Sequence, residues 1–221
     1  MGWLEFAAAY AAFFITHSLP VRPPLRPMLQ TALGPRGFTL AYSALSLAAL
    51  AWLIVAAGRA PFVPLWNWAP WQLYVPLVAM LPVCLILALA IARPNPFSFG
   101  GALNAKFDPA RPGIVRLHCH PLLLALALWA TAHAVPNGDL AHLILFCTFA
   151  IFAILGTRLV DRRRQREMGD TWQKLRSEVA RTPLWPPSLT GDDALRLVAG
   201  LLLYATLIWL HTAVIGVSPL P

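Results

Sequence analysis

Six histidines are the residues best suited to chemistry in this sequence, because neutral imidazole is a strong ligand for haem or a metal ion and carries no charge into a membrane. They are His17, His118, His120, His133, His142 and His211. Three of them lie within residues 93–139, where a loop punctuated by Gly and Pro leads into an apolar segment. An ionisable group at membrane depth indicates a functional site. We therefore expect the function to be centred on this stretch.

A haem held by two histidines needs imidazoles from two helices at one membrane depth. His17 and the pair around residue 119 are expected near one membrane surface. His133 comes 13 residues after His120, so it lies about 20 Å deeper along a helix. His211 is expected close to the level of His133. Depth therefore favours His133 with His211, or His17 with His118 or His120, although a hydrogen bond between helices would also explain each ring alone.

The composition indicates an integral membrane protein. Hydrophobic residues make up 58% of the 221 residues and charged residues only 12%, and the mean hydropathy is +0.64. A soluble domain of this length could not hide so much apolar surface in one core. The three cysteines show no CxxC or CxxCH spacing, which indicates packing residues rather than disulfides or a covalent haem site. The first segment lacks a basic start, so we expect a retained helix rather than a cleaved signal.

Segments of roughly 20 mostly apolar residues are long enough to cross a bilayer as helices. Six candidates occur, at residues 3–20, 38–57, 73–92, 121–135, 140–156 and 194–217. The fourth is short, which indicates a helix that is sunk in protein or extended by the loop before it. The sequence thus predicts an all-α, polytopic bundle of about six transmembrane helices in a lipid bilayer, forming one domain over residues 1–221.

Basic residues are distributed according to membrane topology. All but Arg59 of the 17 lysines and arginines fall in loops on one side of the six predicted helices. Cytoplasmic loops carry such an excess, so both termini are predicted to be periplasmic. The net charge of +8 therefore predicts topology and not nucleic-acid binding. The most basic loop, residues 161–178, is predicted to form a solvated amphipathic helix at the bilayer surface, as a topology signal or as a site for anionic lipid or a substrate phosphate.

Several short sequence motifs, separated along the chain, resemble those of a known protein family. They are THSLPVRP, RPNPFSFGG, GIVRLHCHP, TAHAVPNGD, RLVDRRRQREMGDTW and LHTAVIGVSPLP. Their order and spacing resemble those of the NnrU family of bacterial membrane proteins over essentially the whole chain. The resemblance implies a protein of the inner membrane that supports denitrification, in particular active nitrite and nitric oxide reductases.

NnrU proteins look related to the 15-cis-zeta-carotene isomerases, which bind haem b between helices. In these isomerases the histidines of an HS motif and an AH motif are implicated as axial ligands of the haem. The matching positions in this chain are His17 and His133. The resemblance therefore implies haem b with these two histidines as metal ligands, and either a redox or an isomerase-like role with a redox partner or a small lipophilic substrate. Whether the protein is an enzyme stays open.

Residues near the start of the predicted helix 121–135 complete the expected haem site. His120 is the alternative ligand suggested by depth, and Arg93, Asn95 and Arg116 are expected to line the pocket, where cations can meet haem propionates.

Two further functions compete. His120-Pro121 and the word REMGDTW are similar to motifs of the isoprenylcysteine and phospholipid methyltransferases, which implies S-adenosylmethionine as an alternative cofactor. The third function is a non-catalytic assembly or transport partner of the denitrification reductases.

Overall fold

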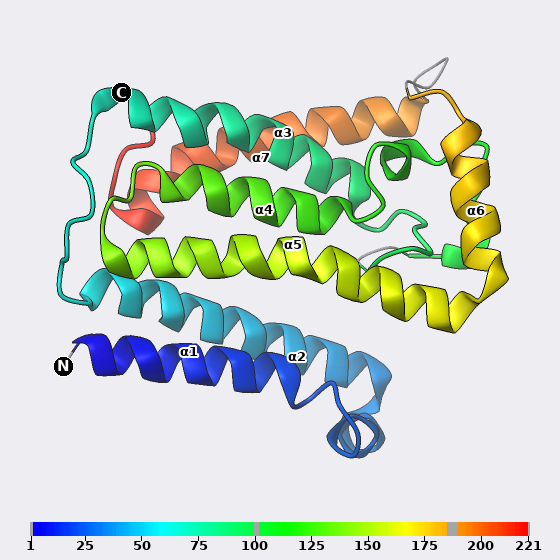
Figure 1. Cartoon of the computed structure of the whole chain (residues 1–221), viewed down its shortest axis with the longest axis horizontal. Helices are drawn as coiled ribbons and strands as arrows, with labels where there is room; N and C mark the ends of the chain where they lie inside the picture. Colours follow the sequence, from blue (N-terminus) through cyan, green and yellow to red (C-terminus); the bar gives the residue numbers. More distant parts are fainter. Residues whose placement is uncertain (1, 100–101, 185–189, 221) are drawn as a thin grey trace. The chain divides into compact units, whose positions relative to one another are not determined.

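The computed structural model describes residues 2–99, 102–184 and 190–220, and these residues form helices and no β-strand (Figure 1). The helices are α1 (Gly2–Ser18), α2 (Leu25–Arg59), α3 (Tyr74–Ala90), α4 (Pro121–Ala134), α5 (Leu140–Met168), α6 (Asp170–Arg181) and α7 (Gly191–Ile215). The predicted all-α class is confirmed.

Among the described residues, four helical stretches are long and apolar enough to cross a membrane. They are Leu25–Arg59, Pro70–Ala90, Leu140–Met168 and Gly191–Ile215. The buried share of their apolar windows runs from only 28% down to 6%. Apolar surface on this scale is stable in lipid and not in water. The protein is therefore a membrane protein, and two of the six predicted segments form the shorter helices α1, with 17 residues, and α4, with 14.

One compact unit contains Met1–Trp66 and Gly138–Leu145. Here α1 packs along α2 through small and aromatic side chains, and Ala9 and Leu53 are fully buried. Helix α2 begins well before the predicted residue 38, because it consists of two helical parts joined at Gly34. Gly34 has φ 70°, which glycine adopts without strain, and Pro35 follows it at the start of the second part.

The other unit contains Asn67–Asn137 and Phe146–Pro221. Helix α3 packs against both α4 and α7 (Figure 1). Gly200 of α7 allows the close approach, because a Cβ there would lie 3.1 Å from Leu85 Cα of α3. Arg196 closes the exposed end of α3 by donating to the carbonyls of Ala88 at 3.0 Å and Ile91 at 2.9 Å.

The predicted surface helix over 161–178 is two helices. Helix α5 continues past its predicted end at Gly156 to Met168. Gly169, with φ 56°, makes the turn into α6. Helix α6 is amphipathic but not fully solvated, because Trp172 and Val179 are buried in a cluster with Phe97 and Val115. This cluster fixes α6 against the two loops that precede α4.

Candidate functional site

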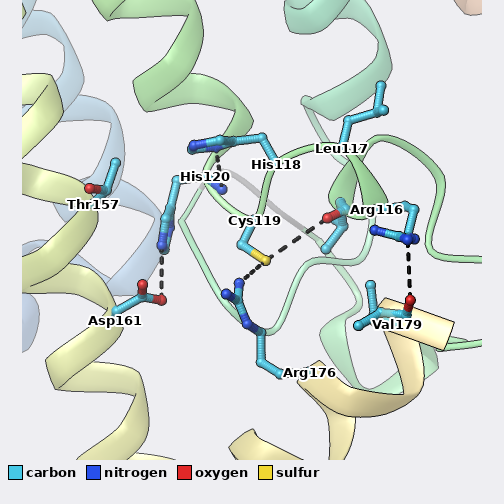
Figure 2. A pocket seen from close by; sticks show the side chains of 11 residues that line it. Arg116, Leu117, His118, Cys119, His120, Thr157, Asp161, Arg176 and Val179 are labelled. Carbon is cyan, nitrogen blue, oxygen red and sulfur yellow. Dashed lines mark hydrogen bonds and ion pairs between the residues drawn. The ribbon is translucent and has the colours of Figure 1, made fainter. Parts of the chain in front are cut away.

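A cavity of about 330 Å³ lies where the loop before α4 meets α5 and α6 (Figure 2). Its volume is at the lower end of the range for small-molecule sites, about 300–1,000 Å³. The polar residues that line it are Arg116, His118, Cys119, His120, Thr157, Asp161 and Arg176. Two guanidinium groups, two imidazoles, a thiol, a hydroxyl and one carboxylate thus share one small space.

His120 stands at the start of α4 and is only 3% exposed. Its Nε2 lies 3.0 Å from Asp161 Oδ1, and its Nδ1 lies 3.0 Å from Ser98 Oγ (Figure 2). Burial lowers the pKa of His120, and the nearby Asp161 carboxylate only partly opposes this effect. The ring is therefore neutral at pH 7. Since a carboxylate only accepts, Nε2 carries the proton and Ser98 donates to Nδ1.

The chain from Ser98 through His120 to Asp161 joins three segments of the sequence. It connects the loop after α3, the start of α4 and the carboxyl-terminal part of α5. Arg164 strengthens the same junction by donating to the Ser98 carbonyl at 3.0 Å. Both ring nitrogens of His120 are therefore engaged, and a ligand role for this histidine would require these bonds to break.

Asn95 is 4% exposed and holds the two loops together. Its Nδ2 donates to the Cys119 carbonyl at 3.0 Å, and its Oδ1 accepts from the Phe97 amide at 3.1 Å. Its own amide donates to Asn104 Oδ1 at 2.9 Å. Asn95 therefore positions the loop that carries Cys119.

Cys119 faces the Arg176 guanidinium, which donates to its Sγ (Figure 2). Burial raises the pKa of Cys119, and the positive charge of Arg176 opposes this shift. The same guanidinium lies 5.1 Å from the Trp172 ring and 6.0 Å from the Phe97 ring. Arg176 is thus held between a sulfur atom and two aromatic faces.

Arg116 binds the carboxyl end of α6. Its Nε donates to the Thr182 carbonyl at 2.7 Å and its Nη2 to the Ala180 carbonyl at 3.1 Å. These acceptors are carbonyls that a helix end leaves without partners. Arg116 therefore fixes α6 over the cavity.

The predicted mouth residues divide between two cavities. Arg116 and His120 line the first, whereas Arg93 and Asn95 line a second cavity of about 190 Å³. Arg93 pairs with Asp192 and, at 2.6 Å, with Asp193 at the start of α7. Its charge is thus compensated within the protein.

His17 and His133 belong to different compact units. His17 Nδ1 lies 2.8 Å from the Phe13 carbonyl, and His133 Nδ1 lies 2.8 Å from the Trp129 carbonyl. Because a carbonyl only accepts, each Nδ1 carries a proton, and in the neutral form of each ring the lone pair is on Nε2. A histidine that ligates a metal commonly donates its other ring N–H in this way. The tautomers of both residues therefore fit axial ligation of haem.

His211 and His142 also make a hydrogen bond through Nδ1, to a backbone carbonyl and to a carboxylate respectively. His211 Nδ1 lies 2.8 Å from the Val217 carbonyl. His142 Nδ1 lies 2.7 Å from Asp139 Oδ2. Across the part of the chain that the structure describes, no group of three or more His, Cys, Asp or Glu side chains is arranged to hold a metal ion.

Five polar residues of the cavity and its support were not predicted as site residues from the sequence: Ser98, Cys119, Thr157, Asp161 and Arg176. We expected Cys119 to be a packing residue, and we assigned Asp161 and Arg176 to a solvated helix. A usable signal was the spacing of Trp172, Leu175 and Val179, which gives that helix an apolar face. Such a face must be covered, so the polar residues beside it are brought into a site.

A family model described as NnrU protein matches residues 5–219, nearly the whole chain. The comparison with curated proteins found no match. The comparison with solved structures also found none.

Proposed function

The chain belongs to the NnrU family, and from this membership we propose that it is a bacterial inner-membrane protein that binds haem b and supports denitrification. Its role would be to help nitrite and nitric oxide reductases become active. It would do so as an electron-handling protein with a redox partner, or as an isomerase-like enzyme with a small lipophilic substrate.

The observation that carries the haem proposal is the anchoring of His17 and His133. Each ring donates Nδ1–H to a carbonyl one helical turn earlier. This bond orients the ring and keeps the Nε2 lone pair available to an iron atom. His133 also packs against Trp129 and Phe146, at centroid distances of 5.5 and 5.7 Å, which limits its rotation. Bound haem would supply one-electron chemistry.

An absorption spectrum of the purified protein, oxidised and reduced, tests the proposal. We expect a Soret band in the wild type that is lost in both His17→Ala and His133→Ala. His142→Ala is the control, because the family resemblance assigns no axial ligand to His142, although its Nδ1 also donates, to Asp139. A wild type without a Soret band, or two variants that both keep it, would overturn the haem assignment.

Methyl transfer is the second candidate, and the place of the larger cavity favours it. This cavity is lined by His120 from the HP word and by Arg176 of the helix that begins within REMGDTW. The methyltransferases that the chain resembles hold S-adenosylmethionine between such motifs. Calorimetry should then detect binding of S-adenosylmethionine, weakened in His120→Ala and Glu167→Gln. Binding of neither cofactor, with copurification of a reductase, would instead support the assembly partner.

A further inference from the structure

We propose that the cavity between the loop before α4 and helix α6 binds a phosphate group, with Arg176 as the main donor and His118 as the second. This site does not depend on haem binding. The ligand is a phosphomonoester, a phosphodiester or inorganic phosphate.

Charge is the first argument. Arg116 and Arg176 contribute two guanidinium groups to the lining, against the single carboxylate of Asp161. That carboxylate already accepts from His120 Nε2 at 3.0 Å. The cavity therefore keeps an excess of positive charge, which an anion would neutralise.

Arg176 is the residue best placed to meet the anion. Unlike Arg93, Arg163 and Arg196, it has no carboxylate partner among the described residues. Only one of its N–H groups is used within the described chain, toward Cys119 Sγ. A guanidinium has five N–H groups in a planar fork, and that fork matches two oxygens of a phosphate.

The position of Arg176 is fixed before any ligand arrives. Its guanidinium lies over Trp172, which is itself buried against Phe97 at a centroid distance of 6.4 Å. Helix α6 is fastened by the two bonds from Arg116 to its last carbonyls. A donor that is already ordered loses little entropy on binding.

His118 supplies the second donor. The His120 amide donates to His118 Nδ1 at 3.1 Å, so the ring proton is on Nε2, which can donate to a ligand. His118 and Arg176 both line the cavity, on either side of Cys119 (Figure 2). The wall also contains Leu117 and Val179, against which the carbon part of a ligand would pack.

Protection of Cys119 from alkylation tests the proposal, because its sulfur lies in the wall that the anion would cover. The full-length protein carrying Cys147→Ser, delipidated in a maltoside detergent, would be treated with N-ethylmaleimide and followed by mass spectrometry at Cys119. We expect inorganic phosphate to slow the modification at least fivefold, with chloride at equal ionic strength as control. An unchanged rate at about 10 mM phosphate, tenfold above a dissociation constant of 1 mM, would overturn the site.

Two matched variants on α6 distinguish phosphate bound at the site from a general effect of removing one positive charge from the helix. Arg176→Gln should weaken the protection by phosphate at least tenfold, and His118→Gln less. Arg181→Gln removes the same charge from an exposed position of α6 and should leave protection intact. Each result is the ratio of rates with and without phosphate in one variant, so a change in the intrinsic reactivity of Cys119 cancels. Equal loss in the Arg176 and Arg181 variants would overturn the proposal.

A second variant covers the case in which Arg176→Gln does not fold, and a comparison of ligands identifies the source of the phosphate. If Arg176→Gln does not fold, Arg176→Lys keeps the charge, loses the planar fork and should still weaken protection. Short-chain phosphatidylglycerol is then compared with inorganic phosphate. Stronger protection by the lipid indicates a headgroup site, and protection by free phosphate alone indicates a soluble ligand. No protection by free phosphate contradicts the proposal, whatever the result with the lipid.

Discussion

The two ends of helix α4 hold their histidines by different means. At its start, His120 is bound by side chains from two other segments, Ser98 and Asp161, and neither ring nitrogen is free. Near its end, His133 is bound by the carbonyl of Trp129 in its own helix and is surrounded by aromatic rings. The first arrangement uses the imidazole to join the fold together. The second fixes the ring and leaves Nε2 without a protein partner among the described contacts, so residue type alone does not separate a structural histidine from a candidate ligand.

The same substitution at both ends should give the largest difference. Phenylalanine keeps a ring but removes both nitrogens. His120→Phe leaves the Ser98 hydroxyl and the Asp161 carboxylate without their partner, and we expect a loss of about 3 kcal/mol in the free energy of unfolding. His133→Phe gives up one bond to a carbonyl that the helix already uses, and should cost about 1 kcal/mol or less. Thermal unfolding in detergent measures both, and equal losses would show that the two ends do not differ.

Removing only the acceptor at the first end should have a smaller effect. Asp161→Ala leaves the buried His120 Nε2–H without a partner, while the bond from Ser98 remains. The expected cost is about 1–2 kcal/mol. Arg163→Ala in the same helix is the control, because its pair with Glu167 at 2.7 Å is exposed and should contribute little. If Arg163→Ala were as unstable as Asp161→Ala, the hydrogen bonds that join Ser98, His120 and Asp161 would not be important for stability.

The sequence predicted the apolar helices better than the cavity. Hydropathy located the apolar helices, since each must satisfy its backbone within itself in lipid. It misplaced the end of α5 because residues 157–168 are charged, yet Arg, Gln, Glu and Met favour helix in water. The cavity could not be predicted in this way. Asp161 follows His120 by 41 positions and Arg176 follows Cys119 by 57, so only the tertiary packing of α5 and α6 brings the members of each pair together.

A pH titration sharpens the comparison at the His120 end. Burial lowers the pKa of His120 in the folded protein, with Asp161 opposing, so the unfolded chain binds the proton more readily. The contribution of His120 to stability is therefore complete above the unfolded pKa of about 6.5 and is lost as the pH falls below it toward the folded value. His118 and Arg176 also face this ring and strengthen the effect. We expect a lower unfolding temperature at pH 5.5 than at pH 7.5, and a smaller difference in His120→Phe. An equal difference in that variant would assign the effect to other groups.

The smallest effect is expected for Trp172→Phe, because Trp172 supports the cavity without taking part in the hydrogen bonds of His120. Its indole Nε1 is buried and has no hydrogen-bond partner within the described chain, so losing that N–H removes no bond. Trp172→Phe keeps an aromatic face beneath Arg176 and should change the free energy of unfolding by no more than about 1 kcal/mol, because the weaker cation–π contact and the relieved desolvation act in opposite directions. Trp172→Ala removes the face altogether and should cost about 3 kcal/mol or more. Both variants would be compared by thermal unfolding. If phenylalanine were as harmful as alanine, the indole N–H would have a partner that matters, and the anchoring of Arg176 would rest on that bond instead of on the aromatic face.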